Sequence, residues 1–209
     1  SAASVSCGGF HTLVLTRTGR VYSMGRDDFG LLGTGSREGL FSAGAEKPLL
    51  VTSLSDQRVS RICCGGWHNL FLTEQGEVYA CGKGEYGRLG GSDESSRDEP
   101  VLVAPSPSPV TAASSKIEEK SPHSQCSKSL VITEMSAGGS HSLLLTSSQE
   151  VWVTGRTDFG RLGLGQHTRG RDRVLQPERL DLSFLSDRGK ARVVQVAAGG
   201  SHSMFVVEL

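Results

Sequence analysis

Four short apolar runs recur along the chain, and each lies two residues after a histidine. The runs are Leu13-Val14-Leu15, Leu70-Phe71-Leu72, Leu143-Leu144-Leu145 and Met204-Phe205-Val206. Their apolar residues are consecutive and do not alternate with polar ones, which is typical of strands that are covered on both faces. No apolar pattern with a period of 3.6 residues lasts long enough for helical repeats. The chain is therefore predicted to form short buried strands.

A common segment, Gly-Gly-x-His, precedes each of these runs. Its four copies end at His11, His68, His141 and His202. A catalytic group is needed only once, whereas packing or hydrogen bonding explains a residue that returns at the same point of every unit. We therefore interpret the four histidines as structural, each bonded to a neighbouring polar group at the start of a buried strand.

Three of the runs lead through a polar turn into a second short strand. These second strands contain Val21-Tyr22, Val78-Tyr79 and Val151-Trp152, so each unit begins with a β-hairpin. The last turn position is Gly19, Gly76 or Gln149. Glycine there supplies the positive φ that such turns need, so Gln149 predicts a slightly strained third turn.

Each second strand ends in a loop with the pattern Gly-x4-Gly-x-Leu-Gly. The repeated glycines of the three loops are Gly30, Gly33, Gly87, Gly90, Gly160 and Gly163. The loop is followed by a variable stretch with a proline and an apolar pair. Repeated units of short antiparallel strands at this spacing predict the blades of a β-propeller.

The combination of Gly-Gly-x-His, an apolar strand, Val-aromatic and Gly-x4-Gly-x-Leu-Gly resembles the repeat of the regulator of chromosome condensation family. The resemblance implies an all-β fold, a seven-bladed propeller. Residues 1–209 then form a single, partial propeller with three complete repeat units and a partial fourth. We expect the chain to be part of a longer seven-bladed ring; an eight-bladed or irregular assembly is the alternative.

Residues 92–130 depart from the repeat. The segment is rich in Ser and Pro and has little to bury, so it is expected to be a disordered insertion between the second and third units. It also lacks the alternating apolar pattern of the wedge that the exchange-factor members of the family use. The segment therefore does not support exchange activity.

Composition narrows the function classes further. The 22 Lys and Arg balance the 22 Asp and Glu, so nothing in the overall charge favours nucleic acid as a partner. We find no apolar run of membrane-spanning length and no signal-peptide pattern, and expect an intracellular protein, cytoplasmic or nuclear, without membrane insertion. The five cysteines are odd in number and have no C-x-x-C spacing, so no disulfide framework, metal site or cofactor is predicted.

Two loops carry candidate chemistry. Residues 82–87 match the phosphate-binding pattern Gly-x-Gly-x-x-Gly, but no helix is predicted after them, so we interpret the match as fortuitous. Arg169, Arg171 and Arg173 follow the third glycine loop and are the candidate partner-binding residues. They could bind an acidic partner or lie in a solvated loop with nearby counter-charges.

We therefore expect a protein-interaction scaffold that binds a protein partner through loops on one face, without catalytic residues. The resemblance implies two alternatives. One is a guanine-nucleotide exchange factor for a Ran-type small GTPase, and the other is chromatin binding. The absence of a basic N-terminal tail counts against chromatin binding.

Overall fold

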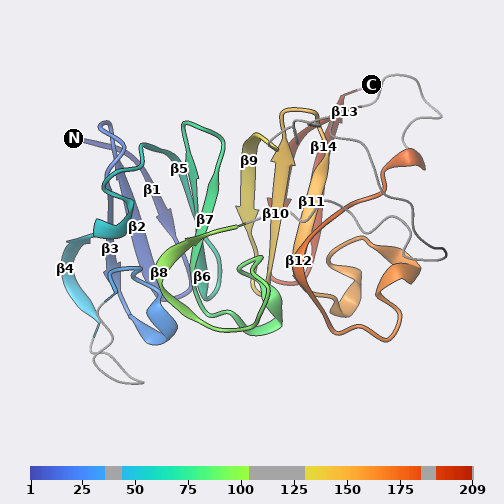
Figure 1. Cartoon of the computed structure of the whole chain (residues 1–209), viewed down its shortest axis with the longest axis horizontal. Helices are drawn as coiled ribbons and strands as arrows, with labels where there is room; N and C mark the ends of the chain where they lie inside the picture. The colour runs from blue at the N-terminus through green and yellow to red at the C-terminus, as the bar shows by residue number, and fades with distance from the viewer. Residues whose placement is uncertain (36–43, 104–129, 185–191, 209) are drawn as a thin grey trace, which may run out of the picture.

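The computed structural model describes residues 1–35, 44–103, 130–184 and 192–208. These residues form three four-stranded antiparallel sheets and one two-stranded sheet, which follow one another across the molecule (Figure 1). The strands of the first sheet are β1 (Ala2–Cys7), β2 (His11–Thr16), β3 (Val21–Gly25) and β4 (Ala45–Leu50); those of the second are β5 (Val59–Cys64), β6 (His68–Thr73), β7 (Val78–Gly82) and β8 (Arg97–Leu102). Those of the third are β9 (Ile132–Ala137), β10 (His141–Thr146), β11 (Val151–Arg156) and β12 (Arg173–Arg179); the fourth sheet holds β13 (Arg192–Ala198) and β14 (Ser203–Glu208).

In every sheet, strands that are neighbours in sequence are also neighbours in space. The Gly-Gly-x-His segment forms the connection between the first and second strands, and the polar turn connects the second and third. The prediction of strands covered on both faces is confirmed for β6 and β10, in which all six residues are buried, whereas buried and half-buried residues alternate in β2. It is wrong for β14, in which Met204 and Val206 are exposed, because no described sheet covers that face. The all-β, antiparallel fold is confirmed.

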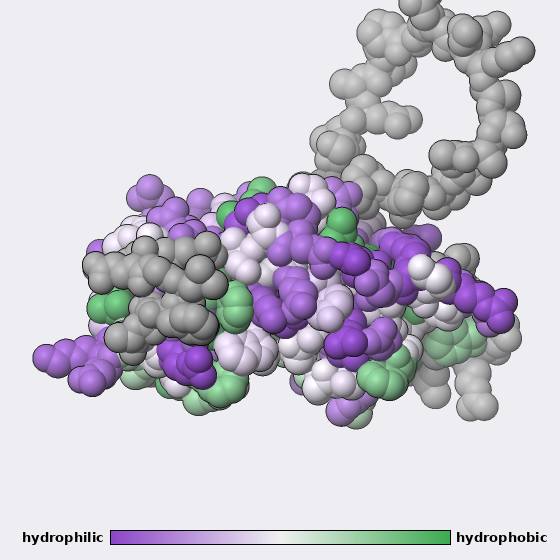
Figure 2. Space-filling view, turned by 90° about the horizontal axis from the view of Figure 1, so that it is seen from below, coloured by the Kyte–Doolittle hydropathy of each residue, from purple (hydrophilic) through white to green (hydrophobic). Residues whose placement is uncertain are grey.

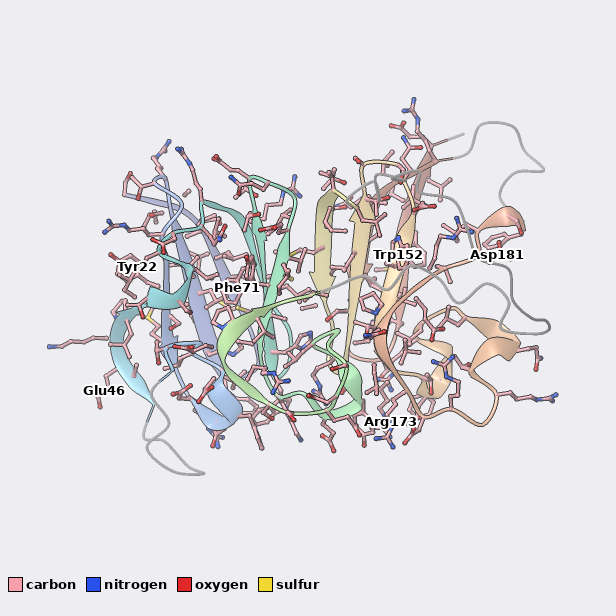
Figure 3. The ribbon with its side chains drawn as sticks, viewed as in Figure 1. Tyr22, Glu46, Phe71, Trp152, Arg173 and Asp181 are labelled. Atoms are coloured by element: carbon pink, nitrogen blue, oxygen red, sulfur yellow. The ribbon has the colours of Figure 1, made fainter. Side chains whose placement is uncertain are left out.

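The hydrophobic core lies between the sheets, since each sheet packs its face against the next. Phe71 belongs to the cluster between the first and second sheets, and Trp152 to the cluster between the second and third (Figure 3). The first strands of adjacent sheets, β1, β5, β9 and β13, also contact one another in order. Adjacent sheets thus pack as the blades of a propeller do.

Loops of different kinds gather at opposite edges of the sheets. The hairpin turns lie at the upper edge in Figure 1, and the glycine loops with the short 3-10 helices η1 (Asp28–Gly30), η3 (Glu85–Gly87) and η4 (Asp158–Gly160) lie at the lower edge. At the upper edge, Gln149 has a φ of 66°, where Gly19 and Gly76 have 79° and 82°. The predicted strain of the third turn is confirmed, because a residue with a side chain occupies the left-handed region there.

One boundary of the predicted insertion differs from the structure. Residues 97–102 lie within the range 92–130, yet they form β8, the outer strand of the second sheet. β8 pairs with β7 through Val101 and Leu102, so the apolar pair that follows Pro100 outweighs the polar composition around it. Residues 104–129, which hold most of the Ser/Pro-rich segment, lie outside the described residues, and their disorder stays a prediction.

Candidate protein-interaction surface

The repeat histidines take part in hydrogen-bond chains that link adjacent sheets. His68 Nε2 lies 2.8 Å from Ser142 Oγ of the third sheet, and Ser142 donates at 2.7 Å to the carbonyl of Arg88 in the second glycine loop. The same arrangement is repeated one sheet further: His141 Nε2 lies 3.1 Å from Ser203 Oγ, and Ser203 donates at 2.6 Å to the carbonyl of Arg161.

Between the first two sheets, Asn69 takes the place of serine. Its Oδ1 lies 2.5 Å from His11 Nε2, and its Nδ2 donates at 2.6 Å to the carbonyl of Leu31. Each described link therefore runs from a histidine to the residue after the next repeat histidine, and then to the glycine loop of the first sheet of the pair.

These chains determine which ring nitrogen carries the proton. The single proton of Ser142 is used on a carbonyl, so His68 must donate from Nε2 and keep Nδ1 unprotonated. Burial lowers the pKa of His68 well below its usual value, and burial together with the nearby Arg161 charge lowers the pKa of His141 to about 4. Both rings are therefore neutral hydrogen-bonding groups near neutral pH.

His11, His68 and His141 come from different sheets, and each bonds to the sheet beside it. Within the described ranges, no group of three or more His, Cys, Asp and Glu side chains is arranged to hold a metal ion. The geometry agrees with a structural role for His11, His68 and His141, and that role stays a prediction until the residues are changed. His202 is exposed.

The glycine loops share a second pattern, a cation, any residue, an acid and an aromatic residue before glycine. Its members are Arg26, Asp28 and Phe29 in the first loop, Lys83, Glu85 and Tyr86 in the second, and Arg156, Asp158 and Phe159 in the third. In each loop the cation and the acid form an ion pair at 2.5–2.6 Å. The aromatic residue has a φ of 60–64° in all three, a strained conformation for a bulky side chain.

Successive loops are joined through these residues. Lys83 Nζ lies 4.9 Å from the ring centroid of Phe29, and the Arg156 guanidinium lies 4.6 Å from that of Tyr86. These are cation–π distances. The first glycine loop also packs tightly against β8, since a Cβ on Gly30 would lie 2.3 Å from the Asp98 Cα. The glycine loops of adjacent sheets are therefore joined along the lower edge of the sheets, and Figure 2 shows the molecule from this side.

An aromatic patch on this face departs from the repeat. We define the aromatic patch as Phe10, Phe29 and Trp67. The Phe10 and Trp67 rings lie 4.5 Å apart between centroids, and those of Phe29 and Trp67 lie 5.9 Å apart, edge to face. Phe10 is 44% and Phe29 39% exposed. In the third and fourth copies of Gly-Gly-x-His, the position of Phe10 and Trp67 is Ser140 or Ser201.

Arg26 borders the aromatic patch. Its guanidinium lies 5.1 Å from the Phe10 centroid and 6.0 Å from that of Trp67. Its Nε donates to Asp28 at 2.6 Å. The Arg26 side chain is 52% exposed, whereas that of Asp28 is only 6% exposed. The pair therefore presents its positive member to solvent and buries its negative one.

The three arginines predicted from the sequence lie on the third sheet and its loop, apart from the aromatic patch. Arg171 forms an ion pair with Glu178 at 2.5 Å, and Arg173 pairs with Asp172 at 2.8 Å and also with Glu94 in the loop before β8. Arg169 is exposed and has no ion pair with the residues that the structure describes. The counter-charges reduce the positive charge that two of the three offer to a partner.

Sequence reasoning missed Phe10, Trp67 and Arg26. A signal was present, because the residue before the repeat histidine changes from aromatic in the first two copies to serine in the last two. A side chain that departs from its repeat does not serve the packing that all copies share.

Comparison with known proteins identifies the family. The regulator of chromosome condensation (RCC1) repeat matches residues 18–72, 75–115 and 149–206, and a second description of the same repeat matches residues 2–31, 59–88 and 132–161. The chain belongs to the RCC1 repeat family, as its repeat pattern predicts. Among the curated relatives, the RCC1 domain-containing protein RUG3, mitochondrial, of Arabidopsis thaliana is 31% identical over 98% of this chain and 40% of its own length.

Other relatives are much longer proteins. The E3 ubiquitin-protein ligase HERC2 of Homo sapiens is 32% identical over 96% of this chain, which corresponds to 4% of the ligase. The chain thus spans less than half the length of each of these two relatives. Within the described part of the chain, no helix has the length and hydrophobicity needed to cross a membrane.

Solved structures with a similar fold are RCC1-type β-propellers. Human WBSCR16 superimposes with a TM-score of 0.75 at 24% identity, covering 98% of this chain and 44% of its own. Prp20p of Saccharomyces cerevisiae superimposes with a TM-score of 0.74 at 18% identity, covering 98% and 43%. At these identities the likeness shows the fold: this chain has the RCC1-type β-propeller fold. The number of blades in a closed ring stays a prediction.

Proposed function

We propose that this chain is a protein-interaction scaffold that binds a protein partner through its glycine-loop face. The observation that carries the proposal is the aromatic patch, in which three aromatic side chains from two adjacent sheets lie together, with Phe10 and Phe29 exposed and Trp67 half-buried. Tyr, Trp and Phe are enriched in protein interfaces, and a few residues near the centre, most often Trp, Tyr and Arg, contribute most of the binding energy.

The scaffold around the patch supports this function. Phe10 and Trp67 each lie directly before a histidine that begins a strand, so rigid sheets hold both rings in place. Rings that are already ordered lose little conformational entropy when a partner binds. Binding residues on loops that a rigid framework positions are a common arrangement in interaction domains.

The alternatives from the resemblance have less support. Prp20p has binding properties toward Gsp1p and histones, but it is only 18% identical to this chain. Exchange activity toward a Ran-type small GTPase and chromatin binding therefore stay predictions. The expected intracellular location, cytoplasmic or nuclear, also stays a prediction, and one relative carries the word mitochondrial in its name.

Affinity capture with matched variants tests the proposal. In the variant Trp67→Ser, the aromatic residue is replaced by the one that the third and fourth copies have at this position. The matched control is Phe159→Ser, which removes an aromatic side chain that is 86% exposed on the same face but outside the patch. We expect proteins captured by the wild type and by Phe159→Ser to be lost with Trp67→Ser, at unchanged melting temperature. Equal capture by all three proteins would exclude the patch as the binding site.

A further inference from the structure

We infer that the aromatic patch recognises an extended protein segment in which a carboxylate lies next to an apolar side chain, with Arg26 binding the carboxylate. This inference rests on the proposed function and names the chemistry of the partner. Three observations support it: the terminal N–H groups of Arg26 have no described partner, its charge is exposed, and cations of this chain already lie over the aromatic rings.

Among the described residues, Arg26 has donors without a partner beside the patch. Its Nε is used on Asp28, while its two terminal nitrogens make no hydrogen bond with any residue in the described ranges. The four N–H groups on these nitrogens can form a fork that matches the two oxygens of a carboxylate. A carboxylate bound there would lie beside the Phe10 and Trp67 rings, which the same guanidinium borders.

The exposure of the three loop ion pairs singles out Arg26. In the second loop Glu85 is more exposed than Lys83, and in the third loop Arg156 and Asp158 are about equally exposed. Only in the first of these pairs is the acid buried while the cation faces solvent. Next to the patch, the member of the ion pair that a partner meets at the surface is therefore the cation.

The aromatic rings themselves disfavour a basic partner. Arg26 already lies over Phe10 and Trp67, and Lys83 over Phe29, so resident cations occupy positions at which a partner's Lys or Arg would stack. A partner's cation would have to displace a resident cation or lie beside it and be repelled. A partner's carboxylate would instead be attracted to the resident cation. The exposed parts of the Phe10 and Phe29 side chains then offer apolar contact to the neighbouring side chain.

Selection from a random peptide library displayed on phage tests the inference without a known partner. We expect the wild-type chain to enrich peptides with Asp or Glu beside an aromatic or aliphatic residue. The enriched peptides are then synthesised, and their affinities are measured by fluorescence polarisation at low and high salt. Arg26→Gln should weaken binding about tenfold or more, the usual effect of losing hydrogen bonds to a charged group, and should reduce the salt dependence.

The matched control is Arg156→Gln, which removes the corresponding cation from the third loop and should leave binding unchanged. Arg26→Gln leaves the buried Asp28 without its partner, so its melting temperature is measured first. If this variant does not fold, Arg26→Lys replaces it, because lysine keeps the charge but loses the fork, and should still weaken carboxylate binding severalfold.

The outcomes separate the inference from the proposed function. Enriched acidic and apolar peptides that lose affinity with Arg26→Gln, and not with Arg156→Gln, would support both. Enriched peptides that need Trp67 but are uncharged or basic, and bind Arg26→Gln as well as the wild type, would overturn the inference and leave the proposed function standing. Enriched peptides that bind Trp67→Ser unchanged, or no enrichment at all, would overturn both.

Discussion

Replacing His68 by alanine tests whether the repeat histidines hold adjacent sheets together. The His68 ring is fully buried, donates to Ser142 of the third sheet and packs on the backbone of Gly65, where an added Cβ would lie 2.6 Å from the ring. His68→Ala removes this hydrogen bond and leaves a cavity between the second and third sheets.

The structure allows the size of the effect to be worked out. Truncating a large buried side chain to alanine costs about 2–5 kcal/mol, and a lost hydrogen bond accounts for about 1 kcal/mol of such a total. We therefore expect about 3 kcal/mol for His68→Ala. For a chain of this length, 1 kcal/mol corresponds to about 2–4 °C, so the melting temperature should fall by about 6–12 °C.

His202→Ala is the matched control, because it changes the same repeat position where the ring is exposed and makes no side-chain hydrogen bond with the described residues. Substitutions at such surface positions usually change stability by no more than about 0.5 kcal/mol. Thermal unfolding followed by circular dichroism would measure both variants under identical conditions. If His68→Ala has the same melting temperature as His202→Ala and the wild type, the structural interpretation of the repeat histidines is wrong.

Three further predictions concern pH, the arginine loop and backbone strain. Because the folded-state pKa of His141 is lowered to about 4, its contribution to stability is complete above about pH 6.5 and is lost as the pH falls toward 4. Urea unfolding should show this slope, and His141→Gln should make it shallower, while the lowered pKa values of His11 and His68 keep part of it. Changing Arg171 and Arg173 to Glu should weaken binding of a captured partner if their loop takes part, and unchanged binding would exclude the loop. Because both residues form ion pairs, the free energy of unfolding should also fall by about 1 kcal/mol, as measured by thermal unfolding. Phe159→Asn should raise the free energy of unfolding by about 0.5–1 kcal/mol, since asparagine tolerates a φ of 60° better than phenylalanine does. A free energy of unfolding below that of the wild type would show that the Phe159 ring has a packing role.

The parts of the fold that the sequence predicts depend on local rules. The apolar runs, the polar turns and the glycine loops each follow from a few consecutive residues, and their repetition shows that they are blades. Gln149 illustrates the precision of such rules, because a single missing glycine predicts a strained turn that the structure contains. β8 illustrates their limit, since its composition resembles the insertion beside it and only its pairing with β7 makes it a strand.

The candidate site could not be predicted in the same way, because it joins residues that are distant in sequence. Phe10 and Trp67 belong to different repeats, and only the packing of β2 against β5 of the next sheet brings their rings together. Arg26 reaches both rings from a loop after β3. No local pattern contains all three residues, so the patch appears only once the sheets are placed side by side.

Differences between copies of the repeat nevertheless point toward this junction. In the second and third loops, Arg88 and Arg161 donate to glycine carbonyls of the next sheet, at 3.1 and 3.4 Å. The first loop has the fully buried Leu31 instead, and Asn69 replaces the serine that bonds the histidine elsewhere. The first junction thus has a buried leucine at the loop position where the other two described junctions have arginine, and aromatic residues before the repeat histidines where later copies have serine. Changes that coincide at one junction, while the other two described junctions keep the repeat, are the changes expected of the proposed partner-binding site.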